Sequence, residues 1–180
     1  MKTILAVLAD GFEETEAVAV LDVLRRLEFD VTTAGLKARE VMGSHWIPMV
    51  ADTTLAECGE AKFDAVFLPG GLPGATTLRD SDKVIELVRR IDAEGGVVAA
   101  ICAAPIVLAR AGLLKGKRFT MYPGFESELG GAVPTGRPAE RDGNLVTGKG
   151  PGAVFAFAAE LAGALGRDTK ELYAGMFVNL

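Results

Sequence analysis

The most reactive side chain in the sequence is Cys102, which lies inside the segment V-V-A-A-I-C-A-A-P that ends at Pro105. The residues before Cys102 are apolar without alternation, which predicts a strand buried on both faces. Pro105 and the apolar residues after it favour the first turn of a buried helix. We therefore expect Cys102 at a sharp strand-to-helix junction, where a nucleophile points out of the carboxyl edge of a sheet.

A thiol at the start of a helix has a physical reason to be reactive. The first N–H groups of a helix lack intrahelical partners, and the helix dipole places partial positive charge there. Both effects are expected to lower the pKa of Cys102 and to make its sulfur nucleophilic and oxidisable. The alternative interpretation is a small core residue, since free cysteine is among the most buried residue types. The strand–cysteine–helix context favours the functional interpretation.

Three acids, Glu13, Glu14 and Glu16, open the helix that follows the first predicted strand. Stabilisation of the helix dipole is a sufficient explanation for two of them. One acid buried beside the thiol would do more. Held protonated by burial, it would donate a hydrogen bond to the sulfur or pass a proton. The residues alone leave open which acid takes that role.

These side chains need elements to position them, and the chain alternates strands with helix-length segments. This alternation predicts one α/β domain over residues 1–180, with a parallel, doubly wound sheet and helices on both faces. Residues 35–52 are expected to form a hairpin-like excursion at an edge. The first four predicted strands are expected to be parallel neighbours. The strands are predicted at 3–8, 30–34, 63–68, 97–101, 118–121 and 145–147, and helices at 54–58, 82–93, 153–165 and 169–176.

In a doubly wound sheet the ligand site lies beyond the carboxyl ends of the strands. The loops expected at that edge contain the acids after the first strand, the Gly-rich segment 69–74 and Cys102. The N–H groups of Gly70, Gly71 and Ala103 are expected to face an oxyanion beside the thiol. For each glycine loop taken alone, turn geometry is an equally good explanation.

Composition excludes several classes of function. The 180 residues carry a net charge of −5, which gives no electrostatic reason to bind nucleic acid or an anionic membrane. The longest apolar run, 97–109, is broken by Pro105 and is too short to span a bilayer. The first residues are interpreted as a strand rather than a signal peptide. With two cysteines and no secretory signal, the chain is expected to be cytoplasmic and without disulfides.

Other catalytic chemistries are also set aside. His45 is the only histidine, so a histidine-based metal cluster is excluded and no Cys/His ligand spacing exists. Serine hydrolysis would need His45 as its base, and the neighbouring Ser44 would point to the opposite face of a strand. No phosphate-binding glycine motif follows a strand. The sequence therefore predicts neither a metal nor a cofactor.

Four segments carry a resemblance to the ThiJ/PfpI superfamily, closest to the branch of the parkinsonism-associated protein deglycase. They are D-G-F-E-E-T-E-A-V, L-P-G-G, A-A-I-C-A-A-P and K-G-P-G, and with their order and spacing they cover essentially the whole chain. The resemblance implies a flavodoxin-like three-layer sandwich, commonly assembled as a homodimer. It also implies that Cys102 is the reactive cysteine, that Glu16 touches its sulfur, and that Gly71 and Ala103 supply backbone donors. The pocket residues by this resemblance are Gly70, Gly71, Ala103, Tyr122, Gly150 and Pro151.

The chain departs from the family pattern at two places. Family proteases usually carry histidine directly after the cysteine, where this chain has Ala103, and the deglycase branch often has histidine where this chain has Tyr122. No Cys–His–acid triad is then possible unless His45 arrives from a partner subunit. Arg26 and His45 match the positions at which the family dimer places basic residues near the neighbour's pocket.

Two functions remain open at this stage. The first is a cysteine-dependent stress-response protein with weak glyoxalase or deglycase-type activity on 2-oxoaldehydes, such as methylglyoxal, or on their protein adducts. In it the Cys102 thiolate attacks the aldehyde and Glu16 shuttles a proton. The second is a non-enzymatic redox sensor or chaperone-like protein in which Cys102 is oxidised to a sulfinate.

Overall fold

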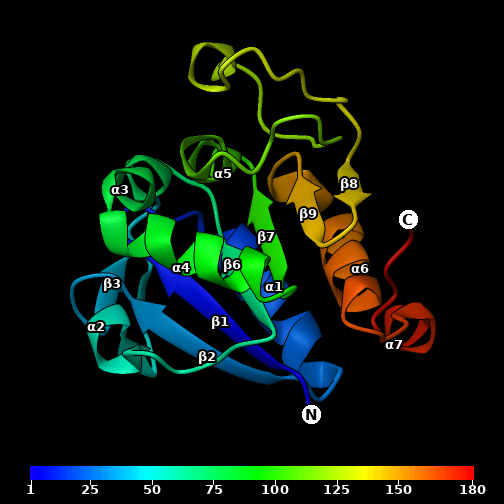
Figure 1. Cartoon of the computed structure of the whole chain (residues 1–180). Coiled ribbons are helices and arrows are strands. Elements are labelled where there is room, and N and C mark those ends of the chain that lie inside the picture. Colours follow the sequence, from blue (N-terminus) through cyan, green and yellow to red (C-terminus); the bar gives the residue numbers. More distant parts are fainter.

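A seven-stranded sheet runs through the centre of the molecule (Figure 1). The computed structural model describes residues 1–180. Neighbouring strands follow the order β5-β2-β1-β6-β7-β9-β8, so that β7 lies inside the sheet between β6 and β9. The strands are β1 (Thr3–Leu8), β2 (Asp30–Gly35), β5 (Thr53–Thr54), β6 (Ala65–Leu68), β7 (Val97–Ile101), β8 (Ala139–Asp142) and β9 (Leu145–Gly148).

All strand pairs in this sheet are parallel except β8 with β9. The four strands expected as parallel neighbours lie side by side in the order β2, β1, β6 and β7. Their carboxyl ends therefore meet at one edge, where Leu8 pairs with Gly35 and Leu68 with Ala100. The predicted α/β class is confirmed, as a mostly parallel sheet with one antiparallel strand at its edge.

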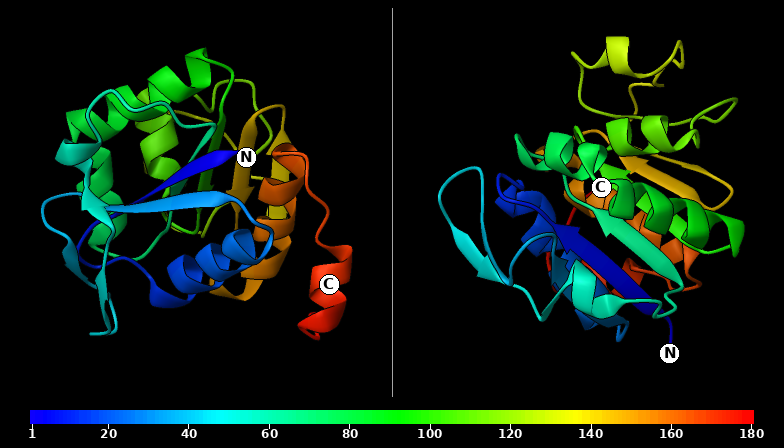
Figure 2. Two further views of the ribbon diagram at one scale, coloured as in Figure 1. Left: turned by 90° about the horizontal axis from the view of Figure 1, so that it is seen from below. Right: turned by 60° about the vertical axis from the view of Figure 1, so that its left-hand side comes forward.

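Helices cover both faces of the sheet and give it three layers (Figure 2). On one face α1 (Glu14–Arg26) packs against α6 (Val154–Ala164), and on the other α3 (Gly74–Asp80) and α4 (Asp82–Ala93) pack against α5 (Pro105–Ala111). Two short helices, α2 (Leu55–Cys58) and α7 (Lys170–Gly175), lie outside these pairs. None of the helices combines the length and the apolar character that crossing a bilayer requires.

The core explains why β1, β6 and β7 have apolar side chains at successive positions. A strand covered by helices on both faces buries every side chain, so alternation disappears. All residues of β6 and β7 are buried, and so are all those of β1 after Thr3. Helix α4 shows the complementary pattern, because only the stripe containing Val84, Val88 and Ile91 faces the sheet.

The strand predicted at 118–121 is wrong, because this segment does not form a backbone ladder. Its N–H groups bond to side chains instead: Arg118 N donates to Asp142 Oδ2 at 2.9 Å, and Thr120 N donates to Thr147 Oγ1 at 2.8 Å. The apolar residues that suggested a strand are nevertheless buried, among them Phe119. Sequence reasoning also left residues 75–81 unassigned, where α3 buries Ala75 and Leu78.

The excursion expected at 35–52 is an antiparallel hairpin of β3 (Glu40–Met42) and β4 (Pro48–Val50). Backbone hydrogen bonds tie it to the loop after β1: Gly11 N donates to Met42 O at 2.7 Å, and Ser44 N donates to Phe12 O at 2.8 Å. The turn of the hairpin is thereby held beside the first residues of α1.

Candidate active site

Cys102 follows β7 directly and adopts a backbone φ of +62°. This left-handed conformation is uncommon for a residue with a side chain, so the surrounding structure must hold it. Two hydrogen bonds do so: Cys102 N donates to Gly148 O and Tyr122 N donates to Cys102 O, both at 2.9 Å. The residue is 9% exposed. The expected strand-to-helix junction is confirmed, with α5 beginning at Pro105.

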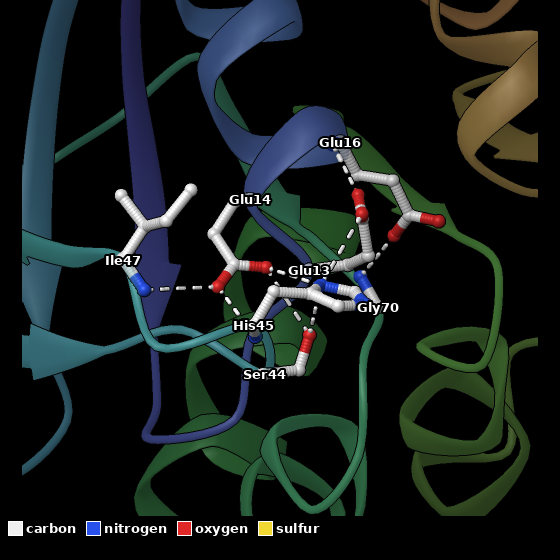
Figure 3. A network of polar contacts seen from close by, with 7 residues as sticks. All are labelled: Glu13, Glu14, Glu16, Ser44, His45, Ile47 and Gly70. Carbon is white, nitrogen blue, oxygen red and sulfur yellow. Dashed lines mark hydrogen bonds and ion pairs between the residues drawn. The ribbon is translucent and has the colours of Figure 1, made fainter.

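Glu16 lies beside this thiol, across the backbone of Gly70. The Glu16 side chain is fully buried, and its Oε2 accepts a hydrogen bond from Gly70 N at 2.8 Å (Figure 3). A Cβ at Gly70 would lie 2.6 Å from the Cys102 Cβ and 2.7 Å from the Glu16 Oε2. The thiol and the carboxyl therefore approach each other only because residue 70 has no side chain. The Gly70 N–H, expected to face an oxyanion, is instead donated to Glu16.

Two further backbone donors act on the sulfur. The N–H groups of Ala103 and Gly71 hydrogen-bond the Cys102 sulfur and favour its charged form. Gly71 has a φ of +87°, and a Cβ there would collide with the backbone of Glu13 and Gly11. Glycine is thus required at position 71 to bring its N–H group to the sulfur.

Burial dominates the electrostatics of the pair. Burial and the neighbouring Glu16 carboxyl raise the pKa of Cys102 to about 12, although the donors of Ala103 and Gly71 oppose the rise. Burial likewise raises the pKa of Glu16 to about 7. The lowered Cys102 pKa expected from the helix start is wrong, because burial and the carboxyl outweigh the helix. Two acids this close share one negative charge near neutral pH.

One oxygen of the pair has no partner. Glu16 Oε1 is buried and accepts no hydrogen bond from the protein. Buried polar atoms are nearly always paired, and an exception of this kind marks strain, a catalytic role or a position where water or an ion binds. The unpaired oxygen belongs to the carboxyl whose pKa is near neutral.

Tyr122, Gly150 and Pro151 lie on the neighbouring loops. A Cβ at Gly150 would stand 3.4 Å from the Tyr122 ring, so the ring lies over this glycine. Tyr122 is half exposed, and Pro151 opens a short 3-10 turn after β9. A separate hollow beside β1 and β2 is lined by Asp10, Lys37 and Thr77 among others, and neither Cys102 nor Glu16 takes part in it.

Glu14 anchors the hairpin (Figure 3). Its Oε1 accepts hydrogen bonds from His45 N at 2.6 Å and Ile47 N at 3.4 Å. Its Oε2 accepts one from Ser44 Oγ at 3.2 Å and lies 2.8 Å from His45 Nδ1. A side chain at Gly43 would collide with the Glu14 carboxyl. The hairpin turn is thus built around one nearly buried carboxylate.

His45 therefore contacts two acidic residues of its own chain, Glu13 and Glu14. Although burial opposes the change, hydrogen bonds from His45 and Ile47 lower the pKa of Glu14 to about 2, and Glu14 in turn raises the pKa of His45. His45 Nδ1 also lies 3.9 Å from Glu13 Oε1. Sequence reasoning missed this neighbourhood, because nothing in the pattern of residues 43–47 indicates where a hairpin turn docks. Arg26 lies at the other end of α1, where it pairs with Asp22.

The side chains of the three acids at the start of α1 make different contacts. Glu13 Oε2 caps the helix by accepting a hydrogen bond from Glu16 N at 2.7 Å. Glu14 holds the hairpin, and Glu16 faces Cys102. Of the residues singled out from the sequence, the structure brings together Cys102, Glu16, Gly70, Gly71 and Ala103.

Fold and site together define an α/β protein with a cysteine at a strained turn beside a buried carboxyl. Residues 2–164 match the family model described as DJ-1/PfpI, and the chain belongs to that family.

Individual relatives agree with this assignment. Protein dj-1beta of Drosophila melanogaster is 41% identical over 98% of this chain and 97% of its own length. A deglycase of Pyrococcus abyssi is 33% identical over 87% of this chain and 95% of its own. The structure of oxidized Toxoplasma gondii DJ-1 superposes over the full length of both chains, with a TM-score of 0.94 and 29% identity.

The raised pKa of Glu16 predicts a pH dependence of stability that Glu16→Gln removes. The folded protein keeps the Glu16 proton up to about pH 7, whereas an unfolded glutamate loses it near pH 4.5. The stabilisation is therefore fully present below pH 4.5 and lost as pH rises to about 7. Between these limits, the unfolding free energy of the wild type should fall relative to Glu16→Gln by about 3 kcal/mol. Urea titrations in metal-free buffer at several pH values measure this difference. If the difference in unfolding free energy between the wild type and Glu16→Gln did not change with pH, the raised pKa of Glu16 would be contradicted.

Proposed function

We propose that this protein converts small 2-oxoaldehydes such as methylglyoxal, or their early adducts on proteins, to 2-hydroxy acids. The observation that carries the proposal is the buried thiol of Cys102 beside the buried carboxyl of Glu16, across Gly70. The Pyrococcus abyssi relative, named a deglycase, supports a reaction of this type.

The first step is addition of the sulfur to the aldehyde. Glu16 takes the thiol proton as the Cys102 sulfur forms a bond to the aldehyde carbon. It then passes that proton to the aldehyde oxygen, which gives a hemithioacetal and leaves Glu16 as a carboxylate. The N–H groups of Ala103 and Gly71 stabilise negative charge on the sulfur before the bond forms. A thiol with a raised pKa is thereby activated only when its proton can pass to the neighbouring carboxyl.

The second step moves a proton between two carbons. Glu16 removes the C–H proton of the former aldehyde carbon and delivers a proton to the adjacent ketone carbon, through an enediol. The first carbon is thereby oxidised to a thioester and the second is reduced to an alcohol. Water then cleaves the thioester and releases lactate from methylglyoxal, together with the free thiol. The net reaction adds one water to the substrate, so no cofactor or outside oxidant is required.

Glu16 suits this role because its pKa is about 7. A proton-transfer group works best when its pKa lies near the working pH, since it must both accept and release the proton. Ala103 and Tyr122 stand at the positions where the resemblance to the family leads us to expect histidine, and His45 is hydrogen-bonded to Glu14. With one carboxyl performing every proton transfer, we expect the turnover to be low.

A second candidate function uses the same pocket. Peroxide oxidises the Cys102 thiolate to a sulfenic acid with release of water, and a second peroxide carries it to the sulfinate. Ala103 and Gly71 would then donate hydrogen bonds to the oxidised sulfur group. The oxidized state of the similar Toxoplasma gondii DJ-1 supports this redox-sensor alternative. Neither cysteine forms a disulfide, which fits a reducing compartment such as the cytoplasm.

A homodimer is part of the proposal. The hairpin turn exposes Trp46 and Ile47, β4 exposes Val50, and α1 exposes Val18. Glu14 fixes this turn beside the start of α1, so these apolar side chains come from neighbouring elements. Exposed apolar surface of this kind favours burial against another protein, here a second copy of the chain.

The enzyme proposal predicts lactate formation from methylglyoxal by the wild type. Cys102→Ala should form no lactate above the uncatalysed rate, because the attacking sulfur is lost. Glu16→Gln should lower kcat by about 100-fold or more, since glutamine cannot carry the proton. The matched control is Cys58→Ala, which removes the other thiol and should keep full activity. Lactate is measured enzymatically, and activity retained by Cys102→Ala would refute the proposal.

The redox alternative predicts selective oxidation. Under mild peroxide, Cys102 should gain two oxygen atoms while Cys58 remains a thiol, because only at Cys102 do backbone N–H groups, those of Ala103 and Gly71, favour the charged sulfur. Peptide mass spectrometry measures both sites in one sample. Equal oxidation at the two cysteines would contradict the role assigned to the pocket.

The dimer prediction concerns the hairpin surface. At micromolar concentration the wild type should sediment as a dimer, and Trp46→Glu should shift it toward a monomer, because a charge would enter an apolar contact. Val133→Glu places the same charge at an equally exposed position on a different loop and should remain dimeric. A monomeric wild type, or equal dissociation by both variants, would exclude this interface.

A further inference from the structure

We propose that the ring of Tyr122 selects 2-oxoaldehydes whose ketone carbon carries a flat aromatic group, so that this group stacks on the ring. The inference names the substrate class of the site described above and therefore rests on the proposed function. It assigns a role to an exposed aromatic side chain that the proposed proton transfers do not use.

Tyr122 is held beside the reactive cysteine by the backbone of Cys102 itself. Tyr122 N donates a hydrogen bond to Cys102 O at 2.9 Å, and Cys102 N donates one to Gly148 O at 2.9 Å. Two residues after Gly148, a Cβ at Gly150 would stand 3.4 Å from the Tyr122 ring. The two hydrogen bonds that hold the turn at Cys102 therefore also fix the position of this ring.

The burial of the reacting pair determines where the rest of a substrate lies. Cys102 is 9% exposed and Glu16 is fully buried, so the opening that leads to the sulfur is small. The aldehyde end of the substrate enters this opening to reach the sulfur. The group on the ketone carbon then rests against the residues that surround the opening.

The residues that flank Cys102 give this surface an apolar character. Leu72 directly follows Gly71, whose N–H contacts the sulfur, and its side chain is half exposed like that of Tyr122. Ala103, directly after the cysteine, adds a buried methyl group. Such surroundings favour an apolar substituent over a charged one.

The ring of Tyr122 favours an aromatic substituent in particular. One side of the ring lies over Gly150, and half of the residue remains exposed to receive a second group. Pairs of aromatic rings are stabilised beyond the effect of the area that they bury, because the face and the edge of a ring carry opposite partial charges. A phenyl group gains this stabilisation, whereas the methyl group of methylglyoxal does not.

The test compares kcat/KM for phenylglyoxal, which yields mandelate, with kcat/KM for methylglyoxal, which yields lactate. Because the two aldehydes differ in intrinsic reactivity, the informative quantity is the change in their ratio between variants. Tyr122→Ala should lower the ratio of phenylglyoxal to methylglyoxal by about threefold to tenfold, whereas Tyr122→Phe should keep it. The matched control is Phe177→Ala, which removes an exposed aromatic ring near the C-terminus and should keep the ratio.

An unchanged ratio in Tyr122→Ala would overturn the role assigned to the ring. An equal fall in Tyr122→Phe would assign recognition to the hydroxyl and would overturn it as well. A wild type that converts neither aldehyde would refute the proposed function, and the role of Tyr122 is then decided by a measurement that needs no turnover.

That measurement is alkylation of Cys102 by phenacyl bromide and by bromoacetone. Each reagent forms a bond from sulfur to its CH₂ carbon and releases bromide and the thiol proton, and the two differ only in a phenyl or a methyl group on the ketone. The ratio of their rate constants, followed by peptide mass spectrometry, should fall in Tyr122→Ala and persist in Tyr122→Phe. The same ratio at Cys58 is the internal reference and should be equal in all variants. A ratio at Cys102 that is unaffected by Tyr122→Ala would overturn the inference.

Discussion

The close approach of two side chains across Gly70 is the constraint on which the site depends. The position that a Cβ would take at Gly70 is filled by Cys102 and Glu16, and the Gly70 N–H is used by the Glu16 carboxyl. Three elements must converge for this to happen: β6 delivers Gly70, β7 delivers Cys102, and α1 delivers Glu16. The parallel order β1-β6-β7 brings all three to one edge, so the sheet topology is a precondition of the chemistry.

Placing a thiol and a carboxyl together in a buried site makes their protonation a property of the pair. Burial disfavours charge on either group, and each charge disfavours the other. The result is one mobile proton near neutral pH. Backbone donors from Ala103 and Gly71 reduce the cost of placing the charge on sulfur, and the Gly70 N–H does so for the carboxyl. Both candidate functions require the thiol proton to pass to the neighbouring carboxyl.

Much of this arrangement could be predicted from local pattern. Apolar runs without alternation located β1, β6 and β7, and the switch from strand to proline located the turn at Cys102. The same reasoning failed at 118–121, because the partners of its N–H groups are side chains from distant strands that no local pattern reveals. It also misjudged the Cys102 pKa, since burial and the approach of Glu16 depend on packing across the sheet. Local sequence patterns predict helices and strands, whereas the pKa values of buried groups depend on which helices and strands pack together.

The three acids at the start of α1 illustrate the same limit at the scale of one turn. All carry the same functional group, and any of them would stabilise the helix dipole. Their separate roles follow from direction: Glu13 turns back to the helix N-terminus, Glu14 points to the hairpin, and Glu16 points under the sheet edge to Cys102. Glu14 and Glu16 are two positions apart in the helix and so point about 200° apart around its axis. Glu13 precedes the helix in extended backbone, so its side chain takes a third direction. Helical geometry, rather than residue type, therefore separates the cap, the anchor of the hairpin and the acid beside the thiol.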